Sequence, residues 1–236
     1  MNKIAPAATK RPSPSVKRPT VTASVADEIR RRIISGEYEG GEQIRQEAIA
    51  TELGVSRIPV REALLQLESE GLVVIHTHKG AIVAALTRED AIDLLEARLA
   101  IEPMLIRKAI AMATPADITH VQSWLAEYEK SLNRNDDATI LSDLNWKLHT
   151  AMYAPANRTR QMAILETLYT AADRYMRLQI RPITARAGAM EDHRQLYEAY
   201  RKKDADAAEG LLRAHITRAF DDILNALQTA LDNHTS

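Results

Sequence analysis

The fold of this chain is decided by one stretch, LGVSRIPVREAL at residues 53–64. Gly54 is placed to end one helix in a left-handed cap, and Ser56 is placed to cap the start of the next. Pro59 falls in the first turn of that next helix, where its missing N–H removes no hydrogen bond. The pattern predicts a helix-turn-helix whose second helix ends at Gly71.

The residues on either side extend this unit into a winged helix-turn-helix. The expected elements are helices over about 22–35 and 46–53, then β-rich runs at 72–75 and 81–84. In the first helix, apolar residues recur every four positions, and the three arginines at 30–32 are expected to face solvent. The order of three helices followed by a hairpin indicates a winged helix-turn-helix more specifically than any single motif within it.

From residue 87 onward the pattern is helical throughout. The expected helices cover about 87–113, 114–133, 136–152, 157–181, 186–202 and 204–230. Six of the eight glycines precede residue 85, so tight turns belong to the front of the chain. The fold class is therefore mainly α, with an N-terminal winged helix-turn-helix followed by an all-α helical bundle.

Composition excludes several classes of protein. The net charge is −1, but residues 1–84 hold 12 Lys/Arg against 10 Asp/Glu, whereas residues 85–236 hold 19 against 22. There is no cysteine, so disulfide scaffolds and thiolate zinc fingers are ruled out. No stretch resembles a membrane span or a signal peptide, and we expect a soluble cytoplasmic protein that does not associate with membranes.

A recognition helix needs hydrogen-bond donors near its N-terminal end. Arg57 and Arg61 share one face, and arginine donates two hydrogen bonds to guanine O6 and N7. Ser56 and the free N–H groups beside it suit a phosphate. Exposed arginines on a helix are usually only solvated, but their place at the start of a third helix favours DNA. The complete set of predicted DNA contacts is Ser56, Arg57, Pro59, Arg61 and, at the hairpin tip, His78, Lys79 and Gly80.

Residues 23–84 resemble the DNA-binding domain of GntR-family transcription regulators. The resemblance is carried by residues 33–44, 53–64 and 67–73. It implies that the start of the third helix contacts operator DNA and that the hairpin tip enters the minor groove. The chain departs from the pattern at Glu47, near a position where some members have a DNA-contacting arginine. A carboxylate repels phosphate, so that contact is not expected here.

Three histidines of the helical half are predicted to point into the interior of the bundle. His149, His193 and His215 each lie on the apolar face of a different predicted helix. A single buried histidine is more often a hydrogen-bonded core residue than a ligand. Three converging neutral imidazoles are costly to bury unless something pairs with them, and a divalent transition metal does so.

Residues 87–228 resemble the FCD effector domain of the FadR-like subfamily. The resemblance is concentrated in residues 93–103 and in the segments around the three histidines. It implies a metal site made by Asn145, His149, His193 and His215, in which Asn145 replaces a more usual aspartate and is a weaker ligand. Zinc, nickel, iron and manganese all suit such a site. A metal-free ligand pocket is the alternative.

A metal with open positions, together with a cation, would bind a small carboxylate. Arg98 is the first candidate for that cation and Arg174 the second, although either could form an internal salt bridge instead. The resemblance implies that the effector is an organic acid, a sugar acid or an amino-acid catabolite.

These observations favour a transcription regulator over an enzyme. We expect a repressor that binds a near-palindromic operator as a homodimer, with a disordered basic arm at 1–20, a DNA-binding domain at 21–85 and an effector and dimerisation domain at 86–232. The alternatives are a metal-dependent hydrolase and a pure metal sensor that uses the same histidines. Against the hydrolase, the sequence has no HExxH motif and no glutamate placed as an evident general base.

Overall fold

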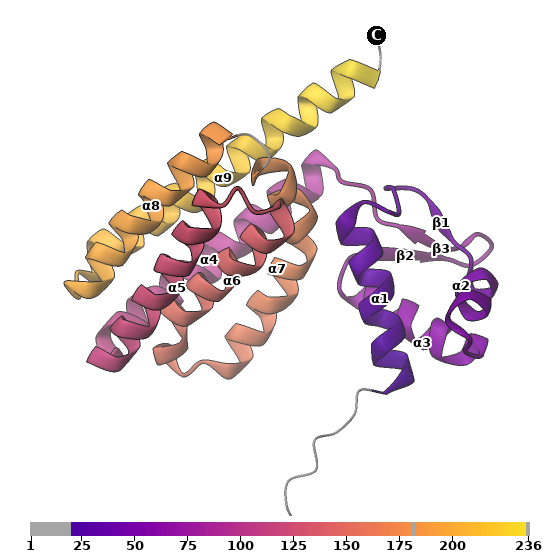
Figure 1. Ribbon diagram of the computed structural model, residues 1–236, viewed down its shortest axis with the longest axis horizontal. Coiled ribbons are helices and arrows are strands. Elements are labelled where there is room, and N and C mark those ends of the chain that lie inside the picture. Colours follow the sequence, from indigo (N-terminus) through magenta and orange to yellow (C-terminus); the bar gives the residue numbers. More distant parts are fainter. Residues whose placement is uncertain (1–19, 181–182, 235–236) are drawn as a thin grey trace, which may run out of the picture.

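The computed structural model describes residues 20–180 and 183–234, with side chains described at 20–176 and 188–229, so the predicted arm lies outside it apart from Thr20. The winged-helix unit consists of α1 (Val21–Ser35), β1 (Gln43–Ile44), α2 (Gln46–Leu53), α3 (Arg57–Ser69), β2 (Val73–His76) and β3 (Gly80–Val83). The helical bundle consists of α4 (Arg88–Met112), α5 (Pro115–Asn133), α6 (Ala138–Tyr153), α7 (Thr159–Ile180), α8 (Ile183–Arg201) and α9 (Ala205–His234), with a short 3-10 helix at Ala154–Ala156. Figure 1 shows the unit and the bundle side by side.

The winged-helix unit has its own hydrophobic core beneath a small antiparallel sheet. Val60, Leu64 and Leu67 of α3 are fully buried in it, as the sequence pattern predicted. Gly54 ends α2 with a φ of 65°, which confirms the predicted left-handed cap. The sheet has the order β1-β3-β2, and its two-residue strand β1 was not expected.

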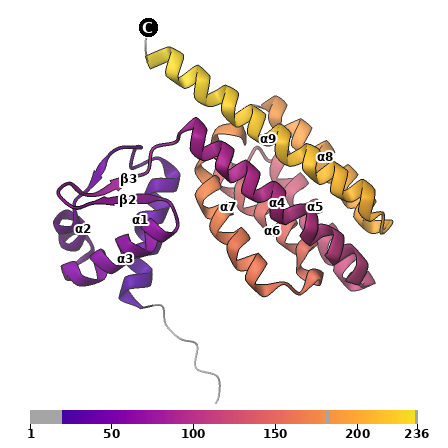
Figure 2. The same ribbon diagram turned by 180° about the vertical axis from the view of Figure 1, so that it is seen from behind.

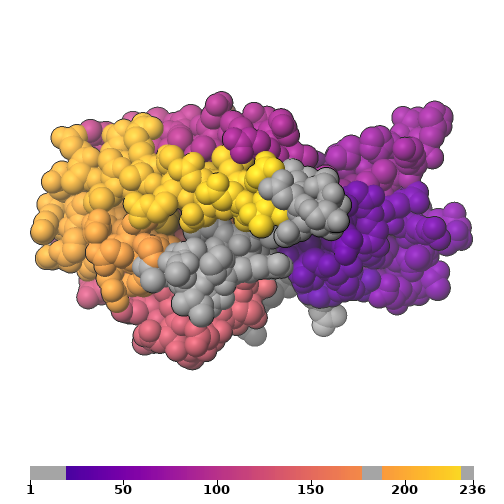
Figure 3. Space-filling view, turned by 90° about the horizontal axis from the view of Figure 1, so that it is seen from above, coloured from indigo at the N-terminus to yellow at the C-terminus, as the bar shows by residue number. Residues whose placement is uncertain are grey.

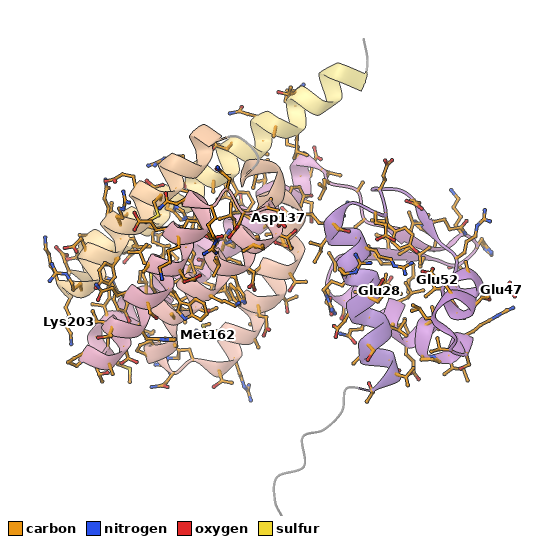
Figure 4. The ribbon with its side chains drawn as sticks, viewed as in Figure 1. Glu28, Glu47, Glu52, Asp137, Met162 and Lys203 are labelled. Carbon is orange, nitrogen blue, oxygen red and sulfur yellow. The ribbon has the colours of Figure 1, made fainter. Side chains whose placement is uncertain are left out.

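The outward orientation expected for all three arginines of α1 is wrong for Arg32. This residue is only 8% exposed. Its guanidinium donates to Glu28 Oε1 of α1 at 2.7 Å and to Glu52 Oε1 of α2 at 2.5 Å, and Figure 4 labels both glutamates. The Glu52 carboxylate of α2 offsets the cost of burying the Arg32 charge. The sequence of α1 alone does not predict this partner.

All six helices predicted for the bundle are present among the described residues. α4 packs along α9, and α5 packs against α6 and α8 (Figures 1 and 2). The helix starts follow the predicted capping chemistry at Thr87 and Thr114, whose hydroxyls accept from Asp90 N and Asp117 N. Among the described helices, none is long and apolar enough to cross a membrane.

The winged-helix unit meets the bundle along α7. Figures 1 and 2 show α7 as the bundle helix next to that unit, and Figure 3 shows the same two parts from above. At one point of this contact, a Cβ on Gly71 would lie 3.7 Å from the Cβ of Ala171. Nearby, Arg30 and Glu70 face Glu166 across a cleft. The linker, residues 84–87, joins β3 to α4 beside this contact.

Candidate DNA-binding surface and histidine cluster

The first turn of α3 presents the predicted DNA contacts to solvent. Ser56, Arg57 and Arg61 are exposed, whereas the opposite face of the helix is buried. Ser56 stands at the N-cap position, but its side chain makes no capping hydrogen bond. Ile58 was not singled out from the sequence, although it is 70% exposed in the same turn. An apolar side chain in this position suits contact with a thymine methyl group.

An ion pair links the start of α3 to the start of α2. The Arg57 guanidinium donates to Glu47 Oε1, although the two side chains are 66% and 73% exposed. Figure 4 shows Glu47 at the edge of the winged-helix unit that faces away from the bundle. Glu47 therefore pairs with one of the two arginines that the sequence predicts as base contacts.

The hairpin tip is arranged as the sequence suggested. His78 and Lys79 are exposed, and Gly80 has a φ of 73°, which favours glycine. Gln43 holds the tip from β1 by donating its side-chain amide to the Lys79 carbonyl. The tip is thus a supported, basic and solvent-accessible loop.

The three predicted histidines meet in the interior of the bundle. His149 comes from α6, His193 from α8 and His215 from α9, and their candidate ligand atoms all lie within 4.8 Å of one another. The Nε2 atoms of His149 and His193 are 3.3 Å apart. Asn145 is buried one helical turn before His149, on the same face of α6. The fold therefore confirms that the three imidazoles converge.

Polar neighbours orient two of the imidazoles toward the cluster. His149 Nδ1 lies 3.1 Å from the Tyr153 hydroxyl, which donates its own hydrogen to Glu102. The Tyr153 hydroxyl oxygen must then accept the hydrogen bond from His149. Nδ1 of His149 therefore carries the proton, and Nε2 is left with a lone pair. His215 Nδ1 lies 3.2 Å from the Asp192 carboxylate, which assigns the same tautomer to His215.

Burial favours the neutral forms of His149 and His193. Burial lowers the pKa of His149 well below its usual value of 6.5, and the charges that His193, His215 and Arg98 would carry lower it further. Burial and then His215 lower the pKa of His193 in the same way. Neutral imidazole is the form that ligates a metal.

The donor set fits a divalent transition metal. Two nitrogens bound to one tetrahedral ion at about 2.05 Å are separated by about 3.3 Å, which matches the observed Nε2–Nε2 distance. His193 Nδ1 is buried and has no hydrogen-bond partner among the described residues, so that ring is not fixed in the core by a hydrogen bond on its outer side. The carboxylate on His215 is the kind of outer partner that metal-bound histidines use.

Arg98 lies beside the cluster in a buried polar network. Its Nε donates to Glu102 Oε1 at 2.5 Å, and its Nη2 donates to the Tyr169 hydroxyl at 2.6 Å. The Tyr153 hydroxyl donates to the other Glu102 oxygen at 2.6 Å and so connects this network to His149. Although burial opposes its charge, Glu102 and Tyr169 raise the pKa of Arg98 above its ordinary value. Its Nη1 is buried and has no partner among the described residues.

Arg174, the second predicted effector contact, is not brought to the cluster. Its guanidinium donates to the carbonyl of Ala84 in the linker at 2.5 Å. α7 lies beside the linker here. The Ala84 carbonyl therefore accepts a hydrogen bond from the guanidinium group that the sequence analysis assigned to an effector.

Four residues of the site went unrecognised in the sequence. They are Glu102, Tyr153, Tyr169 and Asp192. A glutamate four residues after Arg98 on one helix is a detectable signal. The two tyrosines carry no comparable signal, because core tyrosines are common and their partners come from other helices.

A winged helix-turn-helix joined to an all-α bundle with a buried polar site is the architecture of a ligand-responsive DNA-binding regulator. Residues 21–83 match the model of the gntR family of bacterial regulatory proteins, and residues 93–218 match the FCD domain. The chain belongs to the GntR family and carries an FCD effector domain. It is a transcription regulator and not an enzyme, and nothing in the matches supports a hydrolase.

The relatives span nearly the whole chain. The HTH-type transcriptional repressor GlaR of Escherichia coli is 28% identical over 205 residues, which cover 83% of this chain and 92% of that protein. The gluconate operon transcriptional repressor of Bacillus licheniformis is 26% identical over 217 residues, which cover 90% and 87%. The structure of E. coli McbR/YncC has the same fold, with a TM-score of 0.74 at 20% identity over 90% of this chain and 100% of that one. The histidine cluster lies within the region that matches the FCD domain.

Proposed function

We propose that this protein is a metal-containing transcriptional repressor whose operator binding responds to a small carboxylate. The observation that carries the proposal is the convergence of three buried imidazoles beside Arg98, whose Nη1 is buried and has no hydrogen-bond partner among the described residues. A DNA-binding domain at 21–85 and an effector domain at 86–232 are the corresponding parts. The similarity to the repressor GlaR and to the gluconate operon repressor supports the direction of regulation.

The proposed operator contacts centre on the first turn of α3. Arg57 and Arg61 donate to guanine, Ile58 contacts a thymine methyl, and Ser56 and the adjacent N–H groups bind phosphate. Pro59 shapes this turn. The hairpin tip, with His78, Lys79 and Gly80, contacts the neighbouring groove. A homodimer would place two such helices on successive turns of a near-palindromic operator.

A gel shift tests these contacts. Arg57→Ala and Arg61→Ala should each weaken operator binding by about 5- to 150-fold, the range for one good base contact. Arg31→Ala is a matched control, because Arg31 is an exposed arginine of α1 in the same unit. Operator binding as tight as that of the wild-type protein in both α3 variants would contradict the assignment.

The proposed metal ligands are His149, His193 and His215, with Asn145 as a weaker fourth. Zinc, nickel, iron or manganese would act as a Lewis acid with open positions for oxygen ligands. Metal analysis by mass spectrometry, on untagged protein prepared without chelator, should find about one metal per chain. His193→Ala should lose it and His120→Ala should retain it, because His120 is exposed and lies outside the cluster. Metal-free wild-type protein would contradict this part of the proposal.

The proposed effector is a small organic acid held between the metal and Arg98. One relative is named for the gluconate operon, and gluconate is a hydroxycarboxylate. Citrate and gluconate are suitable probes, and binding should raise the melting temperature of the metal-loaded protein but not of His193→Ala. A pure metal sensor would behave differently, because added metal alone would then change operator affinity. Unchanged melting temperatures with a panel of carboxylates would contradict the carboxylate effector.

A further inference from the structure

We propose that Arg174 is a positioning residue for DNA recognition, and that α7 transmits changes around Arg98 to the linker that holds the winged-helix unit. The positioning role stands on the described contacts alone, whereas its use by an effector rests on the proposed function.

The first observation is that α7 binds the linker through two consecutive residues. Arg174 Nη1 donates to the Ala84 carbonyl at 2.5 Å. The Tyr175 hydroxyl accepts from Thr87 N at 3.0 Å and donates to Asp90 Oδ2 at 2.8 Å. Tyr175 is buried, so these bonds are shielded from water. α7 therefore fixes both the start of the linker and the first turn of α4.

The same arginine also lies close to the winged-helix unit itself, where Gly40 leaves room for it. A Cβ on Gly40 would lie 3.6 Å from Arg174 Nη2 and 3.2 Å from the Cα of Ala85. The loop before β1 thus approaches the linker and the arginine closely, and a side chain at position 40 would press on both. Arg174 is the point where the loop, the linker and the bundle meet.

The second observation is that α7 also takes part in the buried network around Arg98. The Tyr169 hydroxyl accepts from Arg98 Nη2 at 2.6 Å and lies 3.3 Å from Glu102 Oε2. Tyr169 precedes Arg174 by five residues, which is about 7.5 Å along a helix. A ligand that draws the Arg98 guanidinium toward itself must change its bond to Tyr169, and a helix moves as a unit over such a short distance.

A purely structural role for Arg174 makes a different prediction. In that case hydrogen exchange in the linker would change when Arg174 or Tyr175 is replaced, but it would not change when the hydroxyl of Tyr169 is removed. Hydrogen exchange in the linker separates the two possibilities without any effector. It also leaves the proposal testable if no carboxylate ligand is found.

Hydrogen-exchange mass spectrometry on the full-length protein should therefore follow peptides that cover residues 84–90. Tyr175→Phe should speed exchange there by roughly two- to tenfold, since it removes the bond to the Thr87 amide. Tyr169→Phe should also speed linker exchange, by at least twofold. Tyr153→Phe is the matched control, because it removes a hydroxyl from the same network but from α6. Unchanged linker exchange in Tyr169→Phe, or an equal increase in Tyr153→Phe, would overturn transmission through α7.

A second measurement tests the positioning role on DNA. Operators with half-sites moved apart in steps of one base pair should show a sharp spacing preference for the wild-type protein. Arg174→Met should flatten this preference at least fivefold while affinity for a single half-site stays unchanged, and Arg174→Lys should restore part of it. A spacing preference that survives in Arg174→Met, or an equal loss of single half-site affinity, would overturn the assignment of Arg174.

Discussion

Replacing Arg98 by methionine should strongly destabilise the helical bundle, because it leaves the buried Glu102 carboxylate without the opposite charge that it is paired with. The side chains of this pair are 2% and 0% exposed, and their closest atoms are 2.5 Å apart. Removing one partner of such a buried pair costs about 3–5 kcal/mol. The Tyr153 and Tyr169 hydroxyls contact Glu102 but do not neutralise it. We expect Arg98→Met to lower the free energy of unfolding by that amount.

A double variant isolates the charge. Arg98→Met with Glu102→Gln removes both charges and keeps an oxygen that accepts from Tyr153, so its loss should be only about 1–2 kcal/mol, the cost of imperfectly satisfied amide groups. Urea unfolding followed by tryptophan fluorescence suits the measurement, because Trp124 and Trp146 both lie in the bundle. A double variant no more stable than Arg98→Met would refute the reasoning. A stable double variant that binds no carboxylate would show that the pair is kept for binding rather than for stability.

Three further predictions concern other parts of the chain. Glu47→Gln should tighten binding to non-specific DNA more than binding to operator, because it frees Arg57 and removes a negative charge, and competition gel shifts measure the ratio. In chelator-treated protein, the free energy of unfolding should fall as the pH drops below about 6.5. The histidines of the unfolded chain take up protons there, whereas buried His149 and His193 stay neutral. Urea titrations should show a loss of up to about 1.4 kcal/mol per pH unit for each histidine. Thr114→Ala removes one half of a capping box and should cost about 1 kcal/mol in the same urea assay.

The exposure of the predicted DNA contacts on α3 could be foreseen because its signals are local. A cap, a proline and two arginines four residues apart define the start of α3 within a few positions, and the structure exposes Arg57 and Arg61 as expected. The convergence of the histidines was also predictable in outline. Each imidazole lies on the apolar side of its own helix, and the interior of one bundle is where such sides meet.

The partners of these residues could not be predicted in the same way. Arg32 is buried because Glu52 of another helix faces it, and Arg174 binds the Ala84 carbonyl ninety positions earlier in the chain. Each contact joins residues of different elements, so no regular spacing in the sequence predicts it. The Glu47 position shows the same limit, because its departure from the family pattern was visible but its bond to Arg57 was not.

The charge distribution explains why small shifts of the winged-helix unit matter for regulation. Residues 1–84 carry only two more basic than acidic side chains, and Glu47 restrains one of the exposed arginines. This small excess gives little non-specific attraction to phosphate, so the proposed homodimer would depend largely on base contacts made by two correctly spaced subunits. Such contacts are lost by displacements of a few ångströms. A coupling free energy of about 1–3 kcal/mol is then sufficient to switch the operator between bound and free, and a few hydrogen bonds between α7 and the linker are of that magnitude.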